Sequence, residues 1–130
     1  MDTMSVIDDS VFITDGRSRS PLRIDLAALQ YTATDMAPSP NNRTSSAASI
    51  DLNGKVYCFG GRGVNSSGNA VSHRRESEFY DTAADAWTVA PKLLVGRESA
   101  TAVELDGKLY VLGGRTRNGQ KSARVEMYAP

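Results

Sequence analysis

The 130-residue sequence has few of the residues that build metal and redox sites, because it contains one cysteine, Cys58, and one histidine, His73. A single cysteine excludes an internal disulfide framework and a cysteine-rich zinc site. His73 has no partner at metal-ligand spacing, so we expect an exposed loop histidine and no metal or other cofactor. Cys58 lies within an apolar run, which predicts a small buried side chain.

An excess of one charge and a long apolar run are also absent. Fifteen Lys and Arg residues balance fifteen Asp and Glu residues, so total charge favours neither a nucleic-acid binder nor an acidic tail. No apolar run approaches the ~18 residues of a membrane span, and the N-terminal Met-Asp-Thr-Met lacks the features of a signal peptide. We therefore expect a single cytoplasmic domain without a membrane partner.

What the sequence does contain is a repeated unit of two apolar strands around a tight turn. Residues 97–114 hold its clearest copy, in which Asp106-Gly107 is the strongest two-residue hairpin signal and a continuous apolar run ends in a glycine pair. A glycine pair lets the chain leave a strand at backbone angles that a side chain would forbid. Residues 45–61 repeat the unit 53 positions earlier without a gap. The paired glycines, which we expect to be structural, are Gly60, Gly61, Gly113 and Gly114.

A degenerate further copy lies at the start of the chain, 98 positions before the clearest one, with Asp9 in place of the turn glycine. The segment after each copy also recurs. In the second copy it contains a strand with Tyr80 and a strand with Trp87; Tyr31 takes the tryptophan's place in the first copy, and the third copy stops at Pro130 before such a strand. We expect Tyr80 and Trp87 to be structural, because large rings at fixed repeat positions bury the area between repeats.

The ordered set of an arginine, two apolar strands, Gly-Gly, a Tyr-Asp strand and a Trp strand resembles the kelch repeat, one blade of a β-propeller with a period of about 50 residues. The resemblance implies an all-β fold: an incomplete kelch-type propeller of antiparallel four-stranded blades, with about 11 strands, in one domain over 1–130. The blades are expected at 3–36, 43–91 and 97–130, the last without its fourth strand. The expected strands lie near 3–8, 10–14, 21–26, 30–35, 44–51, 54–60, 76–82, 86–90, 98–105, 108–113 and 123–128.

So few blades do not close a ring, because propellers typically have four to eight. An open stack leaves two apolar blade faces and an unpaired edge at Val125 to Tyr128. Such an edge invites pairing with another chain, and end repeats without a polar cap limit solubility. Three interpretations stay open: a fragment of a longer propeller, a truncated gene product, or a protomer that self-associates through its open blade edges.

The loops of a propeller fall on two opposite faces, because its strands alternate in direction. Loops between second and third strands share one face with the connections between blades, and hairpin turns occupy the other. A chain with zero net charge is thus predicted to have a basic face and an acidic face. The basic face would hold Arg17, Arg19, Arg43, Arg62, Arg74, Arg75, Arg97, Arg115, Arg117 and Lys121.

This basic face suits an acidic partner, because the planar fork of arginine makes bidentate contacts with carboxylate or phosphate. The kelch resemblance implies that the arginine opening each repeat and the residues after Gly-Gly line a ligand pocket. The candidate binding residues are Arg43, Arg97, Arg62, Arg115, Arg17 and Arg117. For Arg43 and Arg97 a structural alternative stays open, in which they bond carbonyls of the neighbouring blade.

The sequence-based hypothesis is a protein-interaction module that binds an acidic or phosphorylated peptide or protein. No catalytic residue is assigned, since no nucleophile-elbow, phosphate-cradling or paired-carboxylate motif occurs. The alternative is a fragment of a kelch-type enzyme, such as a sugar-acid epimerase or a galactose-oxidase-like protein. Nucleic acid ranks last as a partner, because the basic face lacks interleaved aromatic residues for stacking.

Overall fold

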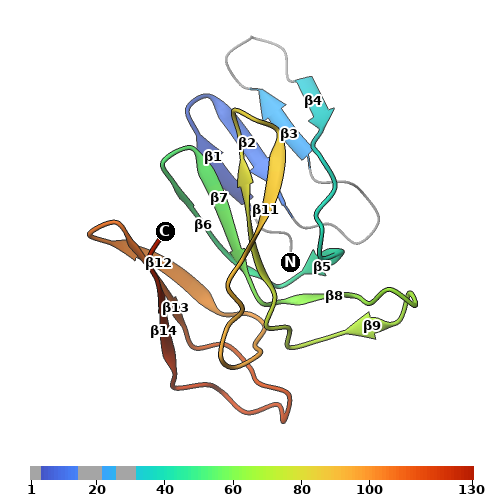
Figure 1. Cartoon of the computed structure of the whole chain (residues 1–130), viewed down its shortest axis with the longest axis vertical. Coiled ribbons are helices and arrows are strands. Elements are labelled where there is room, and N and C mark those ends of the chain that lie inside the picture. The colour runs from blue at the N-terminus through green and yellow to red at the C-terminus, as the bar shows by residue number, and fades with distance from the viewer. Residues whose placement is uncertain (1–3, 15–21, 26–31) are drawn as a thin grey trace.

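The computed structural model describes residues 4–14, 22–25 and 32–130, and every regular element among them is a β-strand (Figure 1). The first sheet has the order β1-β2-β3-β4 and the second has the order β11-β10-β7-β6, while the third has the order β12-β13-β14. Neighbouring strands in these sheets are antiparallel. The all-β propeller architecture is thus confirmed, with eleven strands in the three blade sheets. Their bounds are β1 (Met4–Ile7), β2 (Ser10–Ile13), β3 (Leu22–Asp25), β4 (Thr32–Asp35), β6 (Ala48–Leu52), β7 (Lys55–Phe59), β10 (Ser77–Asp81), β11 (Ala86–Ala90), β12 (Thr101–Leu105), β13 (Lys108–Leu112) and β14 (Val125–Tyr128).

The hairpin turn has the same φ angles in the second and third repeats. Asn53 and Asp106 have φ of 51° and 52°, and the glycines that follow them both have φ of 73°. A two-residue turn with both central φ values positive matches the right-handed twist of the flanking strands. In the first repeat Asp8 also has a positive φ, of 50°, whereas Asp9, in place of the turn glycine, does not. Asparagine and aspartate are the non-glycine residues that tolerate this region best.

The glycine pair ends the second strand of a blade at a point where backbone segments crowd together. Gly61 and Gly114 have φ of 89° and 82°. A Cβ atom on Gly114 would lie 2.7 Å from the carbonyl oxygen of Glu98, and one on Gly61 would lie 2.7 Å from that of Ser45. Both the dihedral angle and the close approach therefore require glycine.

A small additional sheet, in the order β5-β8-β9, was not expected from the sequence. It consists of β5 (Arg43–Ser45), β8 (Arg62–Val64) and β9 (Ala70–Val71). The single strand predicted over 44–51 is wrong, because the chain breaks at Ser46, which has φ of 60°. The third repeat has the same arrangement in reduced form, as backbone bridges from Glu98 to Arg115 and from Arg115 to Lys121.

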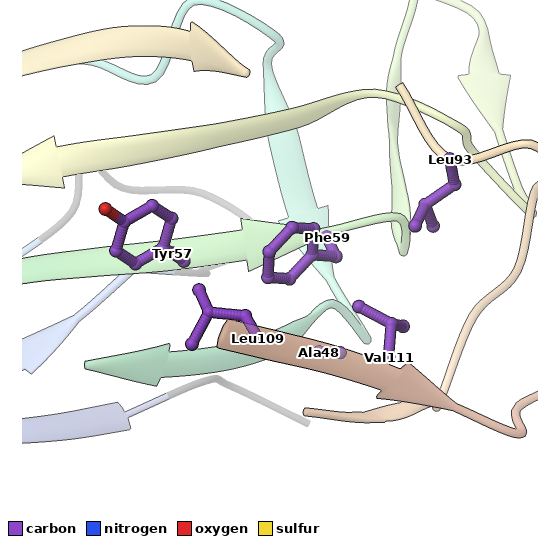
Figure 2. Packing of buried hydrophobic residues seen from close by; sticks show 6 residues of the cluster. All are labelled: Ala48, Tyr57, Phe59, Leu93, Leu109 and Val111. Atoms are coloured by element: carbon purple, nitrogen blue, oxygen red, sulfur yellow. The ribbon is translucent and has the colours of Figure 1, made fainter. Parts of the chain in front are cut away.

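The core lies between the sheets, with β6 placed between β1 and β12. One cluster joins the second and third sheets and comprises Ala48, Tyr57, Phe59, Leu93, Leu109 and Val111 (Figure 2). Another joins the first and second sheets and comprises Phe12, Met36, Val56, Cys58 and Tyr80. Cys58 is fully buried, as predicted.

The rings of Tyr80 and Trp87 tie the second sheet to the segment that enters it. Their centroids are 5.2 Å apart, and the indole Nε1 of Trp87 donates to the carbonyl oxygen of Ala37 at 2.7 Å. The phenol of Tyr80 donates to Oδ1 of Asp85 at 2.5 Å. Burial and this hydrogen bond raise the pKa of Tyr80, so the phenol keeps its proton. Tyr31, at the tryptophan position of the first repeat, lies outside the described residues.

Candidate functional site

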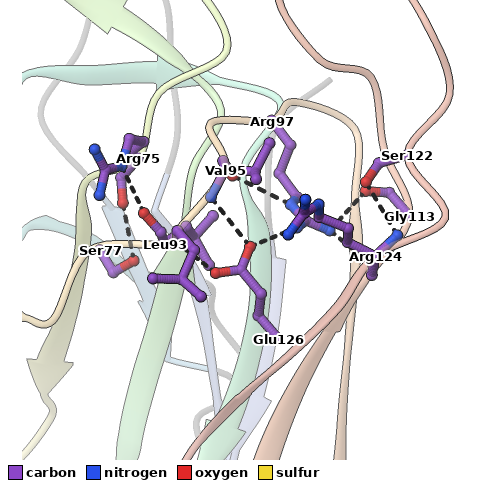
Figure 3. Close-up of polar contacts among 10 residues, drawn as sticks. Arg75, Ser77, Leu93, Val95, Arg97, Gly113, Ser122, Arg124 and Glu126 are labelled. Atoms are coloured by element: carbon purple, nitrogen blue, oxygen red, sulfur yellow. Dashed lines mark hydrogen bonds and ion pairs between the residues drawn. The ribbon is translucent and has the colours of Figure 1, made fainter.

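Arg97 is enclosed by the third sheet, although the sequence placed it on the basic face. Its side chain has no exposed area. Nη1 donates to the carbonyl oxygens of Gly113 at 3.1 Å and Arg124 at 2.9 Å, and Nη2 lies 2.5 Å from Oε2 of Glu126 (Figure 3). Nε is 3.4 Å from the carbonyl oxygen of Val95.

These contacts give Arg97 a structural role in its own blade. The guanidinium satisfies two carbonyls where β13 ends and β14 begins, and its charge is matched by one carboxylate. The opposite end of that carboxylate accepts from the backbone nitrogen of Leu94. A buried charge of this kind is tolerated because it is paired and its donors are used. Arg97 is therefore not available to a ligand.

Arg62 follows the glycine pair, as the sequence predicted, and reaches from the second repeat to the third. Its Nε and Nη2 donate to Glu98 at 2.6 and 2.8 Å in a bidentate pair. Half of the Arg62 side chain is exposed, whereas Glu98 is nearly buried. The hydrogen bond from Arg62 lowers the pKa of Glu98 against the opposing effect of burial. The guanidinium edge of Arg62 that carries Nε and Nη2 is thus already paired with Glu98 in the absence of a ligand.

His73 completes this cluster, and the expectation of an exposed loop histidine is wrong. Its side chain is 14 % exposed, and Nε2 lies 3.6 Å from Oε1 of Glu98. Its Nδ1 is buried without a hydrogen-bond partner, and its backbone has φ of 52°. Glu98 is therefore held between an arginine and a histidine.

Arg115 and Arg117 are also exposed, like Arg62, among the candidate binding residues. Arg115 stands 53 positions after Arg62, at the same place in the repeat, but within the described part of the chain its side chain has no acidic partner. Arg117 projects from the loop between β13 and β14. For Arg43 the backbone is described as part of β5, and Arg17 lies outside the described residues.

A groove runs beside this exposed loop. Its volume is about 430 Å³, and its walls include Ser72, His73, Arg74, Arg75, Lys92 and Arg117 together with Glu76. A neighbouring hollow of about 290 Å³ shares His73, Arg75 and Arg117 with it. The groove thus lies between the segment after β9 and the loop after β13, and we call it the basic groove.

The basic groove carries an excess of positive charge. Four cationic residues and one carboxylate, Glu76, line it. Burial alone would raise the pKa of Glu76, but hydrogen bonds with the backbone and Arg74, together with the charges of Arg74 and Lys92, lower it overall. The guanidinium of Arg74 is already hydrogen-bonded within the protein, since it donates to Glu76 and to the carbonyl oxygen of Asn41. Lys92 is 60 % exposed and 3.5 Å from Glu76. The Nε of Arg75 donates to the Leu93 carbonyl at 2.7 Å.

Sequence reasoning missed three cationic members of this groove. Arg74 and Arg75 were assigned to the basic face but not to the candidate binding residues, and Lys92 was in neither set. All three precede or follow a strand of the second blade on the face that carries the loops between second and third strands. A count of cations at strand ends on that face, in place of a search by repeat motif, would have found them.

Nowhere in 4–14, 22–25 and 32–130 do three His, Cys, Asp or Glu side chains gather as they would around a metal ion. Within the same ranges no helix has the length and apolar character needed to cross a membrane.

Comparison with known proteins identifies the repeat. The family model of the kelch motif matches residues 96–130. Kelch-like protein 25 from rat is 32 % identical over 114 residues, and Kelch-like protein 25 from Xenopus laevis is 39 % identical over 114 residues. Kelch repeat and BTB domain-containing protein 8 from rat is 32 % identical over 96 residues.

The matches cover much of this chain but little of each relative. They include 88 % of the chain for both Kelch-like proteins 25 and 68 % for the BTB domain-containing protein, but 17 % or 16 % of the relatives' lengths. The solved structure of YjhT is 26 % identical with a TM-score of 0.76, covering 90 % of this chain and 34 % of that one. Repeat positions, blade sheets and these matches agree, and the chain therefore belongs to the kelch-repeat family.

Proposed function

We propose that this chain is part of a protein-interaction module whose basic groove binds an acidic or phosphorylated segment of a partner protein. The observation that carries the proposal is the groove itself, which is lined by four cationic residues and a single carboxylate. Its kelch relatives support a general role in protein interaction. The acidic nature of the partner rests on the groove's charge.

The groove supplies cations of two kinds. Arg117 is exposed, and no contact with another described side chain fixes its guanidinium, so both edges of its fork are available for a bidentate contact. Lys92, which also lines the groove, contributes a point charge on a flexible stem. Arg75 uses one nitrogen on the protein backbone and has further donors for a ligand. A carboxylate or phosphate in the groove would meet all three.

This set differs from the one predicted by sequence. Arg97 is buried and Arg62 is paired with Glu98, so neither offers a free fork. Arg117 remains from the predicted set, and Arg115 lies near the groove on an exposed loop. The proposed ligand therefore binds beside the central cluster of Arg62 and Glu98.

The test measures binding of a fluorescent oligo-glutamate peptide, and of a phosphoserine-containing version, by anisotropy. Arg117→Glu removes an attraction of about 1 kcal/mol and adds a repulsion of similar size at most. We expect the dissociation constant to rise about 5- to 30-fold. The affinity of the unmodified chain should fall as salt is added, because exposed charges are screened.

Lys108→Glu is the matched control, because it changes the net charge by the same amount on the opposite face. Lys108 is exposed at the hairpin turn of the third blade. We expect this control to weaken binding less than twofold. Equal losses for the two variants would mean that the peptide responds to total charge, and the groove would then not be the binding site. A chain that binds neither peptide would also refute the proposal.

A further inference from the structure

Each end of the blade stack exposes an apolar sheet face against which no described residue packs. Alternate strand residues point to the same side of a sheet, so pairing in the third sheet defines one such face. The apolar residues of this C-terminal face are Val103, Leu105, Tyr110, Leu112, Val125 and Met127, and the same pairing places Thr101 and Lys108 at its margin. The N-terminal face lies on the first sheet and comprises Met4, Val6, Val11, Ile13, Leu22 and Ile24.

Side chains on both faces are open to solvent. Leu105 and Met127 are 60 % and 55 % exposed on the C-terminal face, and Met4 and Val6 are 64 % and 59 % exposed on the N-terminal face. Contiguous exposed apolar residues of this kind mark an association surface. Burying them removes apolar area from water, which is the main favourable term in association.

The C-terminal face repeats the face of the second sheet that receives the third. Tyr110 and Leu112 stand 53 positions after Tyr57 and Phe59. In the second sheet, the rings of Tyr57 and Phe59 pack against Tyr128 of the third, with centroids 5.8 and 6.0 Å apart. The C-terminal face therefore offers an aromatic and an aliphatic residue at the positions that accept the next blade.

The N-terminal face corresponds, by repeat position, to the side of the third sheet that packs on the second sheet. Val11 and Ile13 stand 98 positions before Leu109 and Val111, which are 0 % and 1 % exposed where the third sheet meets the second. Val6 stands 98 positions before Glu104. The N-terminal face is thus at least as apolar as the surface that already packs in this way.

We propose that the N-terminal face of one copy of this chain packs on the C-terminal face of a second copy, blade on blade. The contact would continue the two sheet-on-sheet interfaces already present within the chain. Two copies with three blade sheets each would close a ring of six, which lies within the usual range of four to eight. A two-fold axis would make the two junctions equivalent.

A second copy is the occupant that the chain itself specifies. Each copy carries one surface of each kind, and the two surfaces are related by the same repeat offsets as surfaces that already pack. A closed pair leaves no apolar end face exposed, whereas an open stack leaves two. The two faces share no residue with the basic groove.

The experiment is the solution mass of the 130-residue chain by light scattering at several concentrations. We expect a mass twice the 14.0 kDa of one chain. Val6→Lys on the N-terminal face and Val103→Lys on the C-terminal face should each give the mass of one chain. Both residues are substantially exposed, and far-ultraviolet circular dichroism verifies that the variants fold.

Leu94→Lys is the matched control, because Leu94 is 75 % exposed but lies outside both faces. It should leave the mass unchanged. Mixing the Val6→Lys and Val103→Lys chains provides a second test: one junction between them is unsubstituted, so mixed pairs should form where neither variant pairs alone.

Three outcomes would overturn the proposal. The first is a wild-type chain with the mass of one copy at all concentrations. The second is a pair that survives Val6→Lys, since that would place the contact at the β14 edge or between two C-terminal faces. The third is dissociation by Leu94→Lys, which would show that the pair does not depend on the two faces.

Discussion

Replacing Arg97 with methionine would test whether the buried guanidinium holds the third blade together. Methionine fills similar space but supplies no donor, so the carbonyls of Gly113 and Arg124 lose their bonds from Nη1. Glu126, which is 12 % exposed, loses its cationic partner. Removing one member of a buried pair costs about 3–5 kcal/mol.

The expected loss is at the lower end of that range, because Glu126 keeps some contact with water and still accepts from the backbone of Leu94. We expect the free energy of unfolding to fall by about 3 kcal/mol, against a total of about 5–15 kcal/mol for a typical domain. With a urea slope of about 1.5 kcal/mol/M, the unfolding midpoint would fall by about 2 M.

Urea unfolding followed by circular dichroism measures this midpoint, at one fixed protein concentration because association shifts apparent stability. Arg117→Met is the control, and an exposed substitution of this kind should change stability by at most about 0.5 kcal/mol. Arg97→Lys keeps the charge but not the fork, so it should lose less than Arg97→Met and remains measurable if the methionine variant does not fold.

The double variant Arg97→Met with Glu126→Leu separates the loss of the Arg97–Glu126 ion pair from the loss of side-chain packing as causes of lower stability. If the carboxylate is destabilising once its partner is gone, the double variant should be more stable than Arg97→Met alone. Additive losses, or a loss below about 1 kcal/mol for Arg97→Met, would refute the structural role given to this side chain.

Two further predictions concern stability. Gly114→Ala should destabilise the fold by more than about 1 kcal/mol in urea unfolding, because the φ of Gly114 is 82° and the new Cβ would approach the Glu98 carbonyl oxygen at 2.7 Å. Gly119→Ala should lower the free energy of unfolding less, because a Cβ at Gly119 would meet nothing within 4 Å. A larger loss for Gly119→Ala than for Gly114→Ala would contradict this prediction. The lowered pKa of Glu98 stabilises the fold above the carboxyl's unfolded pKa, and this contribution is lost as pH falls through the folded value. Arg62→Gln should therefore reduce unfolding free energy at pH 7 more than at about pH 3, and an equal reduction at both would contradict the pairing.

The sequence was a good guide to the blades because their signals are local. An Asn-Gly or Asp-Gly pair fixes a hairpin within two residues, and a glycine pair marks the strand end that follows. The φ angles of Asn53 and Asp106 accordingly agree within a degree. Cys58 is buried because it lies in a continuous apolar strand, which needs no knowledge of distant partners.

The misses depend on contacts between residues far apart in sequence. β5 pairs with β8, which begins 19 positions after Arg43, so no local pattern marks the break at Ser46. The partners that bury Arg97 lie 16 to 29 positions later in the chain. Its position at the start of a repeat was visible in the sequence, but the direction of its side chain depended on those partners.

The small sheet of β5, β8 and β9 also bears on the energetics of recognition. Backbone hydrogen bonds join the long loop after β7, which contains β8 and β9, to β5 at the entry of the second blade. At the tip of this loop, the side-chain oxygen of Asn65 accepts hydrogen bonds from the backbone nitrogens of Ser67 and Asn69. Residues 70–76, which include β9 and the segment directly after it, form one wall of the basic groove. A ligand would then meet a preorganised surface, and little ordering entropy would be subtracted from its affinity.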